Sequence, residues 1–166
     1  MSRAAGATKP LMVIGPVGAG KSTLLKAMNL IHGEVKKTEA LTYLEEAIDT
    51  PGEMVAIPRF YNALILNSIR ARLVLFLMDA SRPIQLPSRL ALALKAPVVG
   101  VITKLDLAGG DQAARARRFL IHAGVKRIFA VSSISGEGMK ELLEWIYGPA
   151  GPEATGPVPS PPGCEG

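Results

Sequence analysis

The stretch LMVIGPVGAGKSTLL, residues 11–25, decides the fold. Its first four residues are apolar, as in a buried parallel strand, and they lead directly into a glycine-rich turn. The turn reads G-x-x-x-x-G-K-S, the pattern of a phosphate-binding P-loop, and Leu24, Leu25 and Met28 predict an amphipathic helix behind it. A strand before the turn and a helix after it are the context that this motif requires, which argues against a chance glycine turn.

Each part of the P-loop has a role in binding a nucleoside triphosphate. Glycines let backbone N–H groups approach phosphate oxygens closely, and the positive end of the helix dipole strengthens their field. Lys21 would place a charge at the β- and γ-phosphates, and the Ser22 hydroxyl would bind Mg²⁺. The expected phosphate-site residues are Gly15, Val17, Gly18, Ala19, Gly20, Lys21, Ser22 and Thr23.

Length and composition predict one nucleotide-binding domain. The 166 residues suffice for one full core, and a chain that is 48% hydrophobic but only 5% aromatic suits a sheet covered by helices. We expect the domain to span residues 10–148. A flexible N-terminus would precede it over residues 1–9, and a disordered tail rich in proline and glycine would follow over residues 149–166.

Composition also argues against several classes of protein. The single cysteine, Cys164, cannot form a disulfide within the chain, and no apolar run reaches the ~18 residues of a membrane span. The net charge is +5, but the densest basic group has no interleaved aromatic residues, which is typical of a solvated helix face. We therefore expect a cytoplasmic protein that binds neither membrane nor nucleic acid.

Strands and helices alternate along the rest of the chain. The predicted strands cover residues 41–43, 47–48, 73–78, 98–102 and 128–131, and the predicted helices cover residues 58–70, 88–94, 111–123 and 139–146. This alternation predicts a three-layer α/β P-loop NTPase fold, with a mostly parallel central sheet flanked by helices. The motifs that start at Gly15, Asp49, Thr103 and Ser132 would then meet at one edge of the sheet.

Two of these motifs suggest the metal and the base. In DTPGE, residues 49–53, Asp49 would approach Mg²⁺ and the Gly52 N–H would approach the γ-phosphate, although alone this sequence is an ordinary turn. In TKLD, residues 103–106, the Asp106 carboxylate could accept hydrogen bonds from both the N1–H and the amine of guanine. Adenine has no matching N1–H, so an unpartnered Asp106 would cost about 1 to 3 kcal/mol.

Further contacts to the base are expected around Asp106. Lys104 would lay its aliphatic stem along the base plane. Ser132 and the Ser133 N–H would address the sugar side and the guanine oxygen. These motifs resemble the N-K-x-D and S-A-K motifs of the Ras-like GTPases. Thr103 replaces the usual Asn, whose amide ties the loop together, and Ser133 with Ile134 replaces the usual Ala-Lys, so the resemblance places Thr103 and Ile134 in the same site.

A narrower resemblance is to the EutP/PduV family of ethanolamine and propanediol utilisation, over about residues 10–147. The segments that carry it are KKTEA at Lys36, AIDTPGE at Ala47, PRFYNAL at Pro58, DASRP at Asp79, VGVITKLD at Val99 and AGVKRIFAVSSISGEG at Ala123. Members of this family are small Ras-like P-loop proteins, and the resemblance implies that this protein has a shell or enzyme partner in a bacterial microcompartment. Some members are credited with ATP-dependent acetate kinase activity, so GTP or ATP with Mg²⁺ is the expected cofactor.

The resemblance also implies a hydrolytic site. The expected metal ligands are Ser22, Thr38 and Asp49. Thr38 and Gly52 would contact the γ-phosphate and release it on hydrolysis. Glu53 stands where Ras-like enzymes usually carry the glutamine that orients water, and its charge would repel the γ-phosphate, so we expect slow hydrolysis. The catalytic candidates are Lys21, Thr38 and Glu53.

Three functions remain open from the sequence. The first is a GTP-dependent switch or assembly factor for a microcompartment, which Asp106, Thr38 and Gly52 favour. The second is an ATP-dependent acetate kinase in ethanolamine catabolism, which the family resemblance alone suggests. The third is an interaction module that keeps nucleotide as a structural ligand without hydrolysing it.

Overall fold

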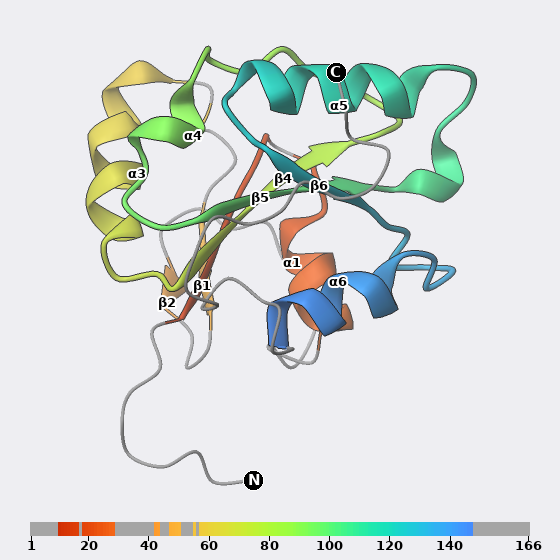
Figure 1. Ribbon diagram of the computed structural model, residues 1–166, viewed down its shortest axis with the longest axis horizontal. Coiled ribbons are helices and arrows are strands. Elements are labelled where there is room, and N and C mark those ends of the chain that lie inside the picture. Colours follow the sequence, from red (N-terminus) through yellow and green to blue (C-terminus); the bar gives the residue numbers. More distant parts are fainter. Residues whose placement is uncertain are drawn as a thin grey trace, which may run out of the picture.

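One sheet of six strands organises the computed structural model, in which we describe residues 10–16, 18–28, 42–43, 47–50, 55 and 57–147 (Figure 1). The strands are β1 (Leu11–Ile14), β2 (Thr42–Tyr43), β3 (Ala47–Asp49), β4 (Leu73–Asp79), β5 (Val98–Thr103) and β6 (Arg127–Ala130). They lie in the order β2-β3-β1-β4-β5-β6. Only the β2–β3 pair is antiparallel among these strands, which confirms the predicted mostly parallel α/β sheet.

Helices cover both faces of this sheet, as a three-layer fold requires (Figure 1). The α-helices are α1 (Lys21–Ala27), α3 (Tyr61–Ser68), α4 (Leu90–Ala93), α5 (Gln112–His122) and α6 (Met139–Tyr147), and the 3-10 helices are η1 (Pro58–Phe60) and η2 (Leu105–Leu107). Helices α1 and α6 pack on one face, and α3, α4 and α5 pack on the other. In the described part of the chain, none of these helices is long and apolar enough to cross a membrane.

Alternating side chains of the central strands feed two separate cores. Met12 and Ile14 of β1 belong to the core under α3, α4 and α5, whereas Leu11 and Val13 belong to the core under α1 and α6. All seven residues of β4 are buried. Burying one such side chain contributes about 1.5 to 3 kcal/mol, so a strand that is covered on both faces selects a continuous apolar run.

Two segments that the sequence predicts as α-helices, residues 58–70 and 88–94, form shorter α-helices in the structure. The segment 58–70 begins as the 3-10 helix η1, and α3 ends at Ser68, whose hydroxyl donates to the Ile65 carbonyl and accepts from the Lys95 N–H. The segment 88–94 is helical only over α4, because Arg89 has a left-handed φ of 61°. The predicted N-terminal segment 1–9 and the tail 149–166 lie outside the described residues.

Candidate functional site

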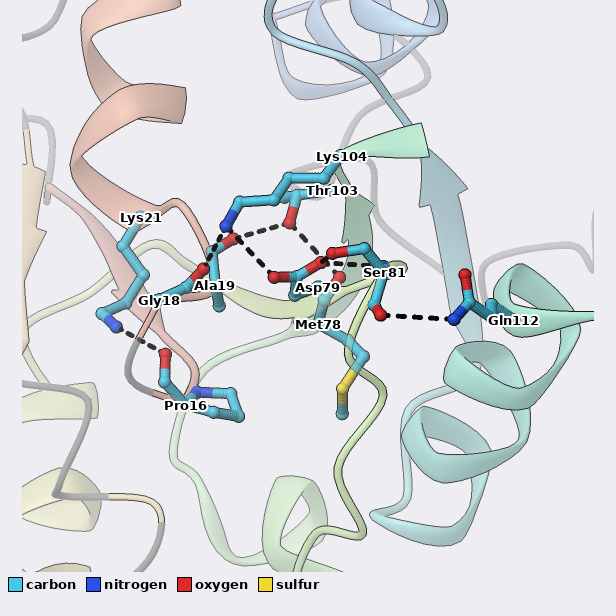
Figure 2. A network of polar contacts seen from close by, with 10 residues as sticks. All are labelled: Pro16, Gly18, Ala19, Lys21, Met78, Asp79, Ser81, Thr103, Lys104 and Gln112. Atoms are coloured by element: carbon cyan, nitrogen blue, oxygen red, sulfur yellow. Dashed lines mark hydrogen bonds and ion pairs between the residues drawn. The ribbon is translucent and has the colours of Figure 1, made fainter. Parts of the chain in front are cut away.

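The carboxyl ends of the parallel strands bring the motif residues to one edge of the sheet, as predicted. The P-loop follows β1, Thr50 follows β3, and Ser132 lies just beyond β6. Asp79 and Thr103 are the last residues of β4 and β5, and they are paired neighbours in the register. Figure 2 shows the part of this cluster that surrounds Asp79 and Thr103.

Glycine is required at several points of the P-loop. Gly18 and Gly20 have φ values of 81° and 87°, which residues other than glycine rarely adopt. A Cβ atom on Gly15 would lie 2.7 Å from the Leu77 carbonyl oxygen, so this residue lets the loop start directly against β4. The glycine spacing therefore fixes both the curvature of the loop and its seat on the sheet.

Lys21 is held inside the P-loop by the loop's own carbonyl groups. Its side chain is buried, and its Nζ lies 3.0 Å from the Gly15 oxygen. The same Nζ lies 3.1 Å from the Pro16 oxygen, a contact that Figure 2 shows. Next to it in α1, Ser22 is half-buried and Thr23 is exposed. An ammonium group fixed at this point is arranged to meet an anion that enters the loop.

The second half of the predicted phosphate site is only partly described. Thr50 is buried, and its backbone N–H and hydroxyl both donate to the Val13 carbonyl, at 3.3 and 2.8 Å. These bonds fix the start of DTPGE beside the end of β1. The backbone of Asp49 belongs to β3, but its side chain lies outside the described residues. The predicted site residues Val17, Thr38, Gly52 and Glu53 also lie outside them.

Thr103 connects β5 to the P-loop through its hydroxyl group. Its Oγ lies 2.6 Å from the Ala19 carbonyl oxygen and 3.3 Å from that of Met78, and the residue is only 3% exposed. The sequence predicted that replacing the usual asparagine removes a tie to the loop. The structure shows that the threonine hydroxyl provides a tie of its own, from a buried position.

Lys104 also reaches the P-loop, and it does so beside Asp79, an acidic residue that was not among the predicted site residues. Its Nζ donates to the Gly18 carbonyl at 2.7 Å and forms an ion pair with the Asp79 Oδ2 at 3.1 Å (Figure 2). The other carboxylate oxygen of Asp79 accepts from the N–H and the hydroxyl of Ser81, at 2.8 and 2.6 Å. The signal that could have revealed Asp79 is an acidic residue at the end of a buried apolar strand.

The surroundings of Asp79 keep it ionised. Burial by itself raises the pKa of its carboxyl group, but the hydrogen bonds from Ser81 and from Lys104 outweigh burial and hold the pKa below the ordinary value of 3.8. The attraction of the Lys104 ammonium acts in the same direction. The pair is therefore a charged contact at neutral pH.

Asp106 and Ser132 form the side of the site that was predicted to bind the base. The exposed Asp106 carboxylate accepts a hydrogen bond from the Ser132 hydroxyl at 2.7 Å, and the same hydroxyl accepts from the Ser135 N–H at 3.1 Å. Ser132, which was predicted to lie at the sugar and base side of the site together with the Ser133 N–H, is fully buried, and its hydroxyl is directed to Asp106. Ser133 is half-buried and Ile134 is 83% exposed on the same loop.

A hollow of about 430 Å³ adjoins the P-loop. Its lining comes from the loop itself, the segment after β4 and the segment after β5. These residues are Pro16, Gly18, Asp79, Ser81, Arg82, Ile84, Lys104 and Leu107. The Asp79–Lys104 ion pair therefore forms part of the lining of this hollow, together with the P-loop residues Pro16 and Gly18.

The described residues are compatible with Mg²⁺ bound in its usual manner beside phosphate. They contain no cluster of three or more histidine, cysteine or acidic side chains that could hold a metal by themselves. Mg²⁺ commonly takes one or two protein ligands and completes its shell with phosphate oxygens and water. A half-buried Ser22 hydroxyl at the start of α1 suits such a partial site.

Comparison with known proteins identifies the family of this chain over residues 8–147. A family profile described as "Ethanolamine utilisation - propanediol utilisation" (PduV-EutP) matches residues 8–147. The propanediol utilization protein PduV of Citrobacter freundii is 29% identical over 83% of this chain and 93% of its own length. The probable acetate kinase EutP of Escherichia coli K12 is 30% identical over 83% of this chain and 89% of its own length.

Solved structures show the same fold. Translation elongation factor SelB of Methanococcus maripaludis, in complex with the GTP analogue GPPNHP, matches 84% of this chain with a TM-score of 0.59 and 24% identity, and the match spans 33% of the SelB chain. A probable GTP-binding protein engB matches 81% of this chain and 94% of its own, with a TM-score of 0.53 and 15% identity. The chain has the Ras-like P-loop fold and belongs to the PduV-EutP family of ethanolamine and propanediol utilisation.

Proposed function

We propose that this protein binds a purine nucleoside triphosphate with Mg²⁺, that the nucleotide is GTP, and that the protein hydrolyses it slowly. The observation that carries the guanine assignment is the Asp106 carboxylate, which is exposed at the sheet edge and oriented by a buried serine 2.7 Å away. A carboxylate held in this way can accept from two donors on one edge of guanine. The relatedness in fold to SelB with its GTP analogue agrees with this proposal.

Each described part of the site has a role in the proposal. The P-loop backbone and Lys21 would bind the phosphates, and Ser22 would bind Mg²⁺, which neutralises charge on the phosphate oxygens. The stem of Lys104 and the exposed Ile134 would cover the faces of the base, which would remove apolar surface from water. We propose Asp49 and Thr38 as the remaining metal ligands and Gly52 as the contact to the γ-phosphate.

Slow turnover follows from the charge proposed near the γ-phosphate. Glu53 would orient water less well than a neutral amide, because its carboxylate repels the phosphate that water must attack. Slow hydrolysis would suit a switch, in which Thr38 and Gly52 release when the γ-phosphate leaves. Single-turnover release of phosphate from GTP measures this directly, and Glu53→Gln should accelerate it.

The deciding experiment is competition of GTP, GDP, ATP and ADP against a fluorescent mant-nucleotide in the presence of Mg²⁺. We expect guanine nucleotides to bind at least tenfold more tightly than adenine nucleotides, and Asp106→Ala to remove most of that preference. Asp111→Ala is the matched control, because Asp111 is also exposed and lies close to Asp106 in the sequence. Equal affinity for GTP and ATP would overturn the guanine assignment, and failure to bind any purine nucleotide would overturn the proposal as a whole.

A second candidate is reversible transfer of the γ-phosphate of ATP to acetate, which gives acetyl phosphate and ADP. The name of the Escherichia coli relative, probable acetate kinase EutP, favours it. The hollow beside Gly18 could admit a small carboxylate, and Arg82 and Lys104 contribute cationic groups to its lining. Acetate-dependent release of ADP that Lys21→Ala abolishes would support this activity, and ADP release that is independent of acetate would exclude it.

The family relationship also supports a partner in a bacterial microcompartment and a cytoplasmic location. We propose that a shell or enzyme protein recognises the triphosphate form. Binding of a purified shell protein should then be stronger with a non-hydrolysable GTP analogue than with GDP. Equal binding with either nucleotide and without nucleotide, together with no release of phosphate, would favour a module that keeps nucleotide as a structural ligand.

A further inference from the structure

Asp79 occupies a position that the proposed nucleotide contacts leave without a role. It ends β4, its side chain is 10% exposed, and it lies between the segment that follows β4 and Lys104 (Figure 2). An ionised side chain buried to this degree is costly unless it is paired and hydrogen-bonded. Here one oxygen accepts from Ser81 twice and the other accepts from Lys104, so the carboxylate is well satisfied in a single orientation.

The orientation of Asp79 matters because its partner Lys104 also contacts the P-loop. The Lys104 ammonium bridges the Asp79 carboxylate and the Gly18 carbonyl, and Gly18 is part of the P-loop. The backbone of Lys104 is left-handed, with a φ of 57°, and its side chain is 37% exposed. A long and partly exposed lysine has many rotamers, so a fixed acceptor on each side is needed to keep it against the loop.

The hydrogen bonds around Asp79 continue through Ser81 and Gln112 to the proposed base side of the site. The Ser81 carbonyl accepts from the Gln112 Nε2 at 3.3 Å, and the Gln112 Oε1 accepts from the Gly109 N–H at 2.8 Å. Gly109 lies just beyond the 3-10 helix η2, which contains Asp106. A chain of polar contacts therefore runs from the P-loop through Lys104, Asp79 and Ser81 to the segment that carries the base-reading carboxylate.

We propose that Asp79 is a positioning residue for nucleotide binding, which fixes Lys104 against the P-loop and couples that loop to the segment carrying Asp106. This inference rests on the proposed nucleotide site and adds to it a residue that touches no nucleotide. Asp79 acts through Lys104, so its contribution to binding depends on the presence of the lysine ammonium.

The test is the affinity of Asp79→Asn for mant-GTP, alone and combined with Lys104→Met. Asparagine keeps the shape and can still accept from Ser81, but it removes the charge that holds Lys104. We expect about tenfold weaker binding, which corresponds to about 1.4 kcal/mol. In the Lys104→Met background the same change should have little effect, because the group through which Asp79 acts is gone. Asp111→Asn, an equal loss of charge at an exposed residue, should bind like the wild type.

Amide hydrogen exchange of the nucleotide-free protein gives a second readout that separates the two proposals. Asp79→Asn should speed exchange in peptides that contain Gly18 and Ala19, and Lys104→Met should speed it to the same extent. The double variant should exchange no faster than either single variant. If the wild type binds no purine nucleotide, the proposed function fails, and the exchange result still decides whether Asp79 holds Lys104 against the P-loop. Unchanged exchange, or an equal loss of affinity with and without Lys104, would overturn the role of Asp79 as a positioning residue.

Discussion

The proposed phosphate side and the proposed base side of the site are built in different ways. On the phosphate side, the loop after β1 makes its own shape from glycines, and Lys21 bonds to carbonyl groups five and six residues earlier. On the base side, Asp106 is oriented by Ser132, which lies 26 residues later and follows another strand. The first side is a local property of one stretch of sequence, whereas the second exists only once the sheet has formed.

The largest expected effect tests the local side. Lys21→Ala should weaken GTP binding roughly 100-fold or more, because a triphosphate in the loop would lose a buried cation worth about 3 kcal/mol or more. Mant-GTP titration measures this, and the unfolding midpoint should be compared to exclude a folding defect. Lys26→Ala is the control, since Lys26 is exposed in the last turn of the same helix. An affinity loss as small as that of the control would mean that the loop does not bind phosphate.

This division explains how much could be predicted from sequence. The P-loop, the alternation of strands and helices and the meeting of the motifs at one edge follow from contiguous patterns, and the described structure confirms the sheet and the edge. The bond from Thr103 to Ala19 spans 84 residues, and that from Thr50 to Val13 spans 37. Such pairs depend on strand order and register, so a single sequence gives no local signal for them. The end of β4 gives a local signal for Asp79 itself, but its pairing with Lys104 is another such long-range contact.

The next largest effect tests whether the two sides are joined through β5. Thr103→Val keeps the shape of the side chain but removes the hydroxyl that donates to the Ala19 carbonyl. Leaving a buried partner unsatisfied costs about 1 to 3 kcal/mol, so urea unfolding should show a loss of stability in that range. Thr103→Ser is the matched control, because it retains the hydroxyl.

A destabilisation by Thr103→Val that is no greater than that of Thr103→Ser would contradict the assigned tie. It would mean that the Ala19 carbonyl gains little from the hydroxyl, and that the Lys104–Gly18 hydrogen bond and the packing of Gly15 against β4 are enough to hold the P-loop. In that case the P-loop would not depend on the Thr103 hydroxyl at the end of β5 for its position.

A smaller effect is expected from loosening the base side alone. Ser132→Ala removes the hydroxyl that orients Asp106, and one hydrogen bond to a charged group is worth about 1.5 to 3 kcal/mol at most in a rigid site. Because Asp106 is exposed and can rotate, we expect only a three- to tenfold loss of GTP affinity, on the order of 1 kcal/mol. ATP affinity, measured by the same competition, should not change. An equal loss of GTP and ATP affinity would mean that Ser132 contributes to binding the phosphates and not to selecting the base.

The smallest effect concerns the contact that joins the two sides, and it is seen by lowering the pH. The pKa of Asp79 in the folded protein is below its ordinary value of 3.8, since the hydrogen bonds from Ser81 and Lys104 outweigh burial. The folded protein therefore binds a proton at Asp79 less readily than the unfolded chain, so this group stabilises the fold above about pH 4 and loses its contribution as the pH falls through the folded pKa. Urea unfolding of wild type and Asp79→Asn at pH 7, 5, 4 and 3 measures the difference, which should be constant between pH 7 and 5 and should narrow below pH 4. A difference that stays constant down to pH 3 would show that the ion pair between Asp79 and Lys104 adds nothing to stability, and would leave the Thr103–Ala19 and Lys104–Gly18 hydrogen bonds as the contacts that join the two sides.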